Sequence, residues 1–281
     1  MSAIAKRESV SETATVTTDL DRARLRRKVP TIYEQDESKY AGPHRWQANS
    51  IAKLGRRLLR RHAYGRWIDR SFTDINITGQ EHLAQVTGPA IFIANHQSHL
   101  DTLLVHAAMP ERLKRRILFG AAQDRWFVKG RKKLVLKPWY QSLALGNFPI
   151  RRGGGKDALA YAEWLLQRSE PIFLFPEGTR ATDDALGEFK HGATLLALKL
   201  GVPIVPIYLG GCASLRPKGT QQTTKGVGHV HILPPVQFAT GSAVAEATEY
   251  LRRRLLAAHE AFNSAKTTAP VTKGVAPQKA A

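Results

Sequence analysis

From Asp74 onward, short apolar runs alternate with longer stretches of helical periodicity. Apolar runs of this length predict β-strands, and the stretches between them, with apolar residues three and four positions apart, predict helices. The expected strands are 74–78, 89–94, 116–121, 172–175, 204–208 and 229–233, and the expected helices are 102–108, 157–168, 188–200 and 243–262. The alternation predicts one α/β domain with a largely parallel or mixed sheet flanked by helices. Its functional groups should gather where strands run into loops at their carboxyl ends.

Composition divides the chain into four parts. Residues 1–43 lack apolar periodicity, and residues 264–281 are rich in Ala, Pro, Thr and Lys, so both are predicted to be disordered tails. Residues 44–73 are predicted to form basic amphipathic helices that precede the domain. Residues 74–263 are predicted to form the α/β domain itself.

The 281 residues carry 42 Lys and Arg against 23 Asp and Glu, a formal net charge of +19. Such an excess implies an anionic partner, which is a nucleic acid, an acidic lipid, a phosphate ester or an acidic protein. The sequence shows no helix-turn-helix, RNA-recognition or zinc-finger signature. A nucleic acid is therefore the remote alternative, and no specific nucleic-acid partner is expected.

Cys212 is the single cysteine, which excludes an internal disulfide and a zinc site built on several thiolates and indicates a reducing compartment. No apolar run reaches the roughly 18 residues that span a bilayer, and the first residues lack the apolar stretch of a secretory signal. We expect a cytoplasmic protein that does not cross a membrane.

The segment between residues 45 and 70 has the pattern of a basic amphipathic helix. Ile51, Leu54 and Leu58 share one side of the helical wheel, and basic residues take the other. Two interpretations stand at this point. The apolar side packs on the core, or it lies in a membrane interface. In the second case the residues that meet anionic lipid are Arg56, Arg57, Arg60 and Arg61. If the helix packs on the core, the docking surface is expected at residues 126–140 instead.

A polar heptapeptide, Asn95-His96-Gln97-Ser98-His99-Leu100-Asp101, directly follows the apolar run 90–94. On one continuous helix His96 and Asp101 would lie about 140° apart, so they can meet only if His96 is still in the loop. The carboxylate would then hold one imidazole nitrogen and leave the other free to take a proton from a hydroxyl.

Two other interpretations of this heptapeptide remain. Ser98 and Asp101 have the spacing of a helix capping box, which can coexist with the histidine–aspartate pair. His96, His99 and Asp101 loosely match zinc-hydrolase spacing, but no further His or Cys cluster supplies the remaining ligands. No metal and no cofactor is expected.

A second polar segment, Phe175-Pro176-Glu177-Gly178-Thr179-Arg180, follows the apolar run 172–175. Here backbone N–H groups beside Gly178 and the guanidinium of Arg180 can converge on a phosphate, although an ordinary turn with solvated Arg180 fits as well. Arg151 and Arg152 precede a three-glycine run, which reads as another anion site or a hinge. The apolar run 202–207 contains two prolines, which favours an edge strand or an irregularity.

In this order the segments resemble the lysophospholipid and glycerolipid acyltransferase family, of which the 1-acyl-sn-glycerol-3-phosphate acyltransferases are typical. The resemblance covers residues 75–210. His96 with Asp101 is similar to the family's H-x-x-x-x-D block, and residues 175–180 reproduce its F-P-E-G-T-R block about 80 residues later. The resemblance implies His96 as general base and Asp101 as its orienting carboxylate. It also implies a set of substrate-binding residues: Asn95, Arg152, Glu177, Gly178, Thr179 and Arg180.

The chain departs from the family in the second block, usually G-x-x-F-I-x-R, which Arg152 closes. Pro149 stands where Phe is common, and Arg151 stands where many lysophosphatidate enzymes have an acidic residue. These departures leave the acceptor open. Residues 202–207 are similar to the fourth block, attributed to donor contact or packing.

The resemblance implies transfer of a fatty acyl group from an acyl-CoA or acyl-carrier-protein thioester to the hydroxyl of a lysophospholipid. The most direct acceptor is 1-acyl-sn-glycerol 3-phosphate, which gives phosphatidic acid. The alternatives are another acceptor, such as glycerol 3-phosphate, a lyso-ornithine lipid or a glycolipid, and a non-enzymatic basic protein that binds lipid or nucleic acid. The expected partners are the thioester donor, the lysophospholipid and an anionic membrane surface. Because the implied substrate resides in a bilayer, the expected location is cytoplasmic, peripheral on the inner face of the membrane.

Overall fold

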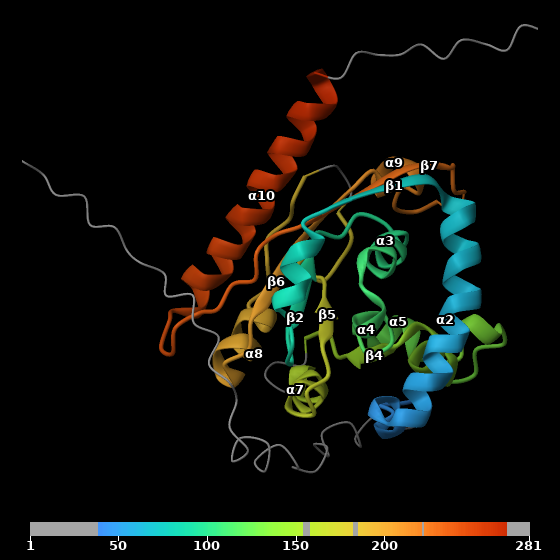
Figure 1. Cartoon of the computed structure of the whole chain (residues 1–281). Coiled ribbons are helices and arrows are strands. Elements are labelled where there is room, and N and C mark those ends of the chain that lie inside the picture. Colours follow the sequence, from blue (N-terminus) through green and yellow to red (C-terminus); the bar gives the residue numbers. More distant parts are fainter. Residues whose placement is uncertain (1–38, 154–157, 182–184, 221, 269–281) are drawn as a thin grey trace, which may run out of the picture.

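A computed structural model describes residues 39–153, 158–181, 185–220 and 222–268. Its centre is a seven-stranded sheet in the order β1-β7-β6-β2-β5-β3-β4 (Figure 1). All neighbours pair in parallel except β6 and β7, which are antiparallel. The mixed α/β sheet that the alternating pattern predicts is therefore confirmed. The strands are β1 (Phe72–Thr78), β2 (Ile91–Ala94), β3 (Leu118–Ala122), β4 (Asn147–Ile150), β5 (Ile172–Leu174), β6 (Ile204–Gly210) and β7 (Gly226–Ile232).

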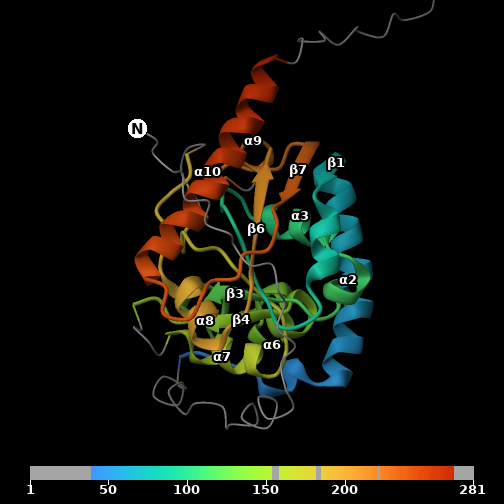
Figure 2. The ribbon, with the colours of Figure 1, turned by 60° about the vertical axis from the view of Figure 1, so that its left-hand side comes forward.

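Helices cover both faces of the sheet. Helices α2 (Ser50–Ser71) and α3 (Asp101–Ala108) lie on one face, and α7 (Ala160–Gln167), α8 (Gly192–Leu200) and α10 (Val244–Thr268) lie on the other (Figures 1 and 2). Because side chains alternate along a strand, β2 supplies Phe92 to the first core and Ile91 and Ile93 to the second. The shorter helices are α4 (Glu111–Lys114), α5 (Gln123–Trp126), α6 (Pro138–Tyr140) and α9 (Cys212–Leu215). Short 3-10 turns occupy Arg45–Ala48, Gln80–Gln85 and Leu134–Leu136, and a π-helical turn occupies Gln141–Leu145.

Two strands differ from the sequence prediction. Strand β4 was not predicted, because Pro149 and the glycines around it hide a four-residue strand. It lies at the sheet edge with Pro149 opposite Ala121, and an edge strand tolerates a missing N–H. Strand β6 contains Pro206 yet lies inside the sheet, so the edge position that its prolines favoured is wrong. Its pairing with β7 begins only at Ile207, one residue later, so Pro206 removes no hydrogen bond from that ladder.

Helix α2 buries part of its basic side, which the sequence analysis expected to face lipid or water. Arg56 and Arg60 are 0% and 2% exposed, whereas Ile51, Leu54 and Leu58 are 82%, 59% and 55% exposed. The prediction that Arg56 and Arg60 contact a membrane surface is therefore wrong. The alternative, in which the apolar stripe packs on the core, is wrong as well. Arg57 and Arg61 remain exposed.

Backbone carbonyl groups from outside α2 make this burial possible. Arg56 donates to the carbonyl oxygens of Gln47 at 2.8 Å and Arg115 at 3.4 Å. Arg60 Nη2 donates to those of Ile117 at 3.1 Å and Leu145 at 2.8 Å, and the same guanidinium also bonds to Ala144 and Lys114. Burial lowers the pKa of Arg56 to about 9 and that of Arg60 to about 10, so both remain charged at neutral pH. Guanidinium groups are suited to this role because each has five donors.

The ends of the folded part differ slightly from the predicted boundaries. Helix α10 continues to Thr268, so residues 264–268 are helical rather than part of a tail. At the other end, Tyr40 pairs with Val128, and the backbone N–H of Ala41 donates to Phe127 at 2.9 Å. The rest of both predicted tails, 1–38 and 269–281, lies outside the described residues, as does most of the three-glycine run. In the part of the chain that the structure describes, no helix has both the length and the apolar character to cross a membrane.

Candidate active site

The heptapeptide 95–101 forms the turn between β2 and α3, at the carboxyl end of a central strand. Strand β5 runs parallel to β2 and ends beside it, and the segment 175–180 follows β5 directly. Strand β6 is also parallel to β2 and carries its carboxyl end to the same edge. The sheet therefore brings both polar segments together, as parallel strands do in α/β proteins.

His96 and Asp101 form a hydrogen-bonded pair in this turn. His96 Nδ1 lies 2.9 Å from Asp101 Oδ2, which also accepts the backbone N–H groups of Gln97 at 2.7 Å and Ser98 at 2.8 Å. Because α3 begins only at Asp101, His96 is in the loop, as the pairing requires. Asp101 thus caps backbone groups and contacts the imidazole at once.

The surroundings of His96 fix the orientation of its ring. The ring stacks on Phe175 with the centroids 3.9 Å apart, and the His96 side chain is 17% exposed. An ionised carboxylate only accepts hydrogen bonds, so Asp101 selects the tautomer with the proton on Nδ1. Among the described residues no hydrogen bond engages His96 Nε2. That nitrogen is the one able to accept a proton.

Asn95 and Glu177 position the backbone around His96. The Asn95 amide donates to the Leu209 carbonyl and accepts from the Leu209 N–H, both at 2.8 Å, and Asn95 is buried. The amide therefore joins the turn to β6, and the contact of Asn95 with substrate stays a prediction. Glu177 Oε1 accepts the N–H of His96 at 2.8 Å, and Oε2 accepts that of Gly187 at 3.3 Å. Burial raises the pKa of Glu177, and these two hydrogen bonds act in the opposite direction.

The segment 175–180 folds into a loop that is fastened to the histidine turn. The N–H of Ala181 donates to the His96 carbonyl at 2.8 Å, so the loop is joined to His96 both through the Glu177 side chain and at Ala181. Gly178 adopts a left-handed φ of 69°, which favours glycine, and Thr179 is exposed beside it. The loop is thus a built turn rather than a loose connection.

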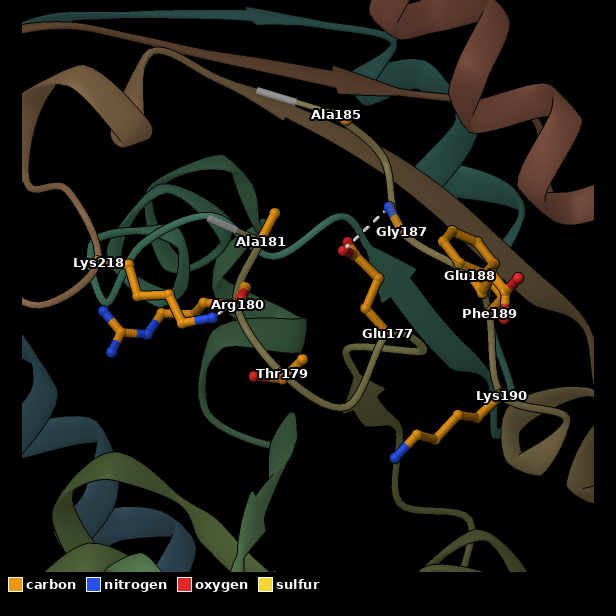
Figure 3. Close-up of a pocket in the computed structure, with 10 residues that line it drawn as sticks. All are labelled: Glu177, Thr179, Arg180, Ala181, Ala185, Gly187, Glu188, Phe189, Lys190 and Lys218. Carbon is orange, nitrogen blue, oxygen red and sulfur yellow. Dashed lines mark hydrogen bonds between the residues drawn. The ribbon is translucent and has the colours of Figure 1, made fainter. Parts of the chain in front are cut away.

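A pocket of about 480 Å³ opens beside this loop (Figure 3). Figure 3 shows Glu177 turned toward Gly187, while Arg180 and Lys218 lie together on the other side. Lys218 Nζ donates to the Arg180 carbonyl at 2.7 Å, which fastens the loop after β6 to the pocket wall. The pocket is lined by Glu177, Thr179, Arg180, Ala181, Ala185, Gly187, Glu188, Phe189, Lys190 and Lys218.

Three guanidinium groups gather around His99, next to the catalytic candidate. Arg125 Nη2 lies 3.1 Å from His99 Nε2. Burial and the charges of Arg180, Arg125 and Arg216 lower the pKa of His99 to about 3. The Nε atom of Arg216 is buried without a hydrogen-bond partner among the described residues. Cations held this close, with a donor left unpaired, fit an anion bound between them.

Arg152 is not among these groups. It forms a two-pronged ion pair with Asp124, in which Nε lies 3.1 Å from Oδ1 and Nη2 contacts Oδ2. This hydrogen bonding raises the pKa of Arg152 and lowers that of Asp124. The ion pair with Asp124 occupies this guanidinium, and the role of Arg152 in acceptor binding stays a prediction.

The sequence analysis missed Arg125, Arg216 and Lys218 as site residues. Arg216 and Lys218 follow β6, and Arg125 follows β3. All three thus come after the carboxyl ends of strands, where parallel strands deliver functional groups. Inspecting every basic residue at such positions would have found them.

Cys212 is buried next to the site. Burial and the neighbouring Asp101 carboxylate raise the pKa of its thiol well above the ordinary value. A thiol held neutral in this way is a poor nucleophile. Within the described ranges no group of three or more His, Cys, Asp or Glu side chains is placed to hold a metal ion.

At one edge of the mixed sheet, the protein thus places an imidazole that a buried carboxylate orients, and a group of cations lies nearby. Such a site in an α/β protein is suited to general-base chemistry on an anionic substrate. Residues 74–210 match the model of the family described as Acyltransferase. Residues 74–210 therefore form a domain of the acyltransferase family, and the resemblance drawn from the sequence motifs is confirmed.

Several named proteins share this domain. The chain is 34% identical over 155 residues to the chloroplastic 1-acyl-sn-glycerol-3-phosphate acyltransferase LPAT1 of Arabidopsis thaliana, covering 53% of this chain and 40% of that protein. It is 31% identical over 162 residues to the 1-acyl-sn-glycerol-3-phosphate acyltransferase of Salmonella typhimurium, covering 56% and 60%. The crystal structure of the 1-acyl-sn-glycerophosphate acyltransferase PlsC from Thermotoga maritima is similar with a TM-score of 0.58 and 25% identity, covering 76% of this chain and 81% of that one. The chain thus spans about half the length of these curated relatives.

Proposed function

We propose that this chain is an O-acyltransferase that moves a fatty acyl group from a thioester donor to the free hydroxyl of a lysophospholipid. The most direct acceptor is 1-acyl-sn-glycerol 3-phosphate, which gives phosphatidic acid, and the names of the relatives support it. The donor is acyl-CoA or acyl carrier protein. The observation that carries the proposal is the pair of His96 and Asp101 beside a pocket walled by Arg180.

In the proposed reaction His96 is the general base. Asp101 holds Nδ1–H, and Nε2 takes the proton of the acceptor hydroxyl while that oxygen attacks the thioester carbonyl carbon. The tetrahedral intermediate collapses, the C–S bond breaks, and the leaving thiolate takes the proton back from the imidazolium. The products are an ester and a free thiol. The buried carboxylate stabilises the imidazolium that forms between the two proton transfers.

The cationic groups would hold the acceptor phosphate. Arg180 offers a two-pronged contact, and the unpaired Nε of Arg216 adds a donor from the loop after β6. Burial and the charges of Arg125 and Arg216 lower the pKa of Arg180. A bound phosphate would relieve the repulsion among these three guanidinium groups. Holding the phosphate in place also positions the attacking hydroxyl, and this positioning accelerates the reaction.

The test is release of free thiol from acyl-CoA by the purified protein, measured against a panel of acceptors. Thiol release should require an acceptor and should be fastest with 1-acyl-sn-glycerol 3-phosphate. Glycerol 3-phosphate, a lyso-ornithine lipid and a glycolipid represent the other acceptors. Faster turnover of an acceptor without phosphate would contradict the role given to the cations, and no thiol release with any acceptor would contradict the enzymatic proposal.

We also propose that the protein docks on the inner face of an anionic membrane, since its substrates carry acyl chains. Ile51, Leu54 and Leu58 form an exposed apolar stripe on α2, and the exposed Arg57 and Arg61 flank it. Leu54→Ser with Leu58→Ser should weaken sedimentation with phosphatidylcholine–phosphatidylglycerol vesicles and leave activity on a detergent-dispersed acceptor intact. Unchanged sedimentation would shift the docking surface to residues 126–140.

A further inference from the structure

A second pocket, of about 460 Å³, lies between α2 on one side and the end of α3 with α4 on the other. Five of its lining residues are basic and only Glu111 is acidic. The basic residues are Arg57, Arg60, Arg61, Lys114 and Arg115. The pocket also contains His106, near the end of α3, whereas Asp101 of the active site begins that helix. The pocket is therefore separate from the site around His96.

Most of the positive charge in this pocket is available to a ligand. Among the described residues no hydrogen bond or ion pair engages the side chains of Arg61, Lys114 and Arg115. Arg57 Nε lies 3.3 Å from Glu111 Oε1, but both side chains are more than half exposed, so this ion pair is weak. The guanidinium of Arg60 is occupied by carbonyl groups and contributes charge alone.

His106 lines this pocket together with the cationic groups of Arg60 and Lys114. Its ring stacks on Tyr64 with the centroids 4.4 Å apart, and the residue is 8% exposed. Burial and the charges of Arg60 and Lys114 lower the pKa of His106 to about 3. The charges of Arg60 and Lys114 disfavour a further positive charge in the pocket, and the same charges favour a bound anion.

The neighbouring surface of α2 indicates which anion. Residues three and four apart are neighbours on a helix, so Arg57 and Arg61 form a row directly beside the row of Leu54 and Leu58. The leucines are exposed and apolar, while the arginines face the pocket. A ligand with a phosphate next to acyl chains matches both rows at once, whereas free phosphate matches only the first.

We propose that this pocket binds the headgroup phosphate of an anionic membrane phospholipid, at a site distinct from the one where the acceptor reacts. The lipid stays in the bilayer, its phosphate between α2 and Lys114 and its acyl chains along the exposed stripe. This site would set the orientation of the protein on the membrane as well as its affinity.

The test uses the full chain and two triple variants with the same loss of charge. The pocket variant carries Arg61→Gln, Lys114→Gln and Arg115→Gln. The control variant carries Arg252→Gln, Arg253→Gln and Arg254→Gln on α10, on the opposite side of the molecule from α2 (Figure 2). Binding is measured by sedimentation with vesicles of phosphatidylcholine alone or with added phosphatidylglycerol. The partition coefficient onto the anionic vesicles should fall at least about tenfold in the pocket variant and less than about threefold in the control variant.

Three results would overturn the proposal. Equal losses in the two variants would mean that net charge alone drives binding, and an unchanged pocket variant would mean that the pocket is not used. If inorganic phosphate binds the wild type but not the pocket variant, and both bind vesicles equally, the ligand is free phosphate. Thiol release from a detergent-dispersed acceptor should be equal in wild type and pocket variant, which separates this proposal from the acyltransferase activity.

Discussion

The turn after β2 and the helix α2 both bury a charged side chain, but the hydrogen-bond partners of the two side chains lie at very different distances along the sequence. Asp101 is 1% exposed, and its Oδ2 takes hydrogen bonds from His96, Gln97 and Ser98, all within five residues. Arg60 is 2% exposed, and its acceptors lie 54 to 85 residues away. Charge with local partners is visible in a sequence motif, whereas charge with distant partners looks like a solvated surface.

The largest effect expected is on the local site. His96→Ala should lower kcat at least about 10²-fold, because no other group in the turn can take the hydroxyl proton. Asp101→Asn should also lower kcat, because it removes the carboxylate that selects the His96 tautomer. Thiol-release kinetics measure both changes, and circular dichroism checks the fold. A His96→Ala variant that keeps more than about a tenth of wild-type activity would rule out the general-base role.

The bonds between Arg60 and its distant carbonyl acceptors should contribute to the free energy of unfolding. Arg60→Met should lower the free energy of unfolding by about 3–5 kcal/mol, because it leaves backbone carbonyls buried without donors. The matched control is Arg61→Met on the exposed side of the same helix, which should change it by less than about 0.5 kcal/mol. Denaturant unfolding measures both. Similar losses in the two variants would mean that the burial of Arg60 contributes nothing beyond helix formation.

A smaller effect is expected at the cationic pocket. Arg180→Lys should raise KM for 1-acyl-sn-glycerol 3-phosphate by roughly tenfold, since lysine cannot make the two-pronged contact. Arg216→Gln should act in the same direction. An acceptor without phosphate is the control and should respond less to either change. If both acceptors respond equally, these arginines shape the loop and do not bind the phosphate.

The effect of pH on stability is expected to be gradual. The pKa of His106 is about 3 in the folded protein and 6.5 in its ordinary state, so only the unfolded chain takes a proton as the pH falls below about 6.5. Stability should therefore decline as the pH is lowered from 7 toward 3. His106→Phe keeps the stacking on Tyr64 and should make this decline shallower by up to about 1.4 kcal/mol per pH unit. An unchanged slope between pH 6 and pH 4 would show that His106 titrates normally.

The same contrast explains how much could be predicted from the sequence. The alternating apolar runs located the strands except β4, whose Pro149 and neighbouring glycines look like a loop. The two polar segments were predicted correctly as turns at the carboxyl ends of strands. The orientation of α2 could not be predicted, because its arginines bond to the backbone, which carries no sequence signal. Arg125 and Arg216 were missed for a related reason, since only the sheet order brings their loops together.

The bonds of Arg60 also set an order of folding. Its acceptors are the carbonyl groups of residues 114, 117, 144 and 145, so α2 can settle on the domain only after the chain up to β4 has folded back. Closing loops of this length is slow compared with forming a helix. Until then Arg56 and Arg60 stay hydrated, while Leu54 and Leu58 are exposed both before and after docking. We expect α2 to be among the first helices made and among the last to dock.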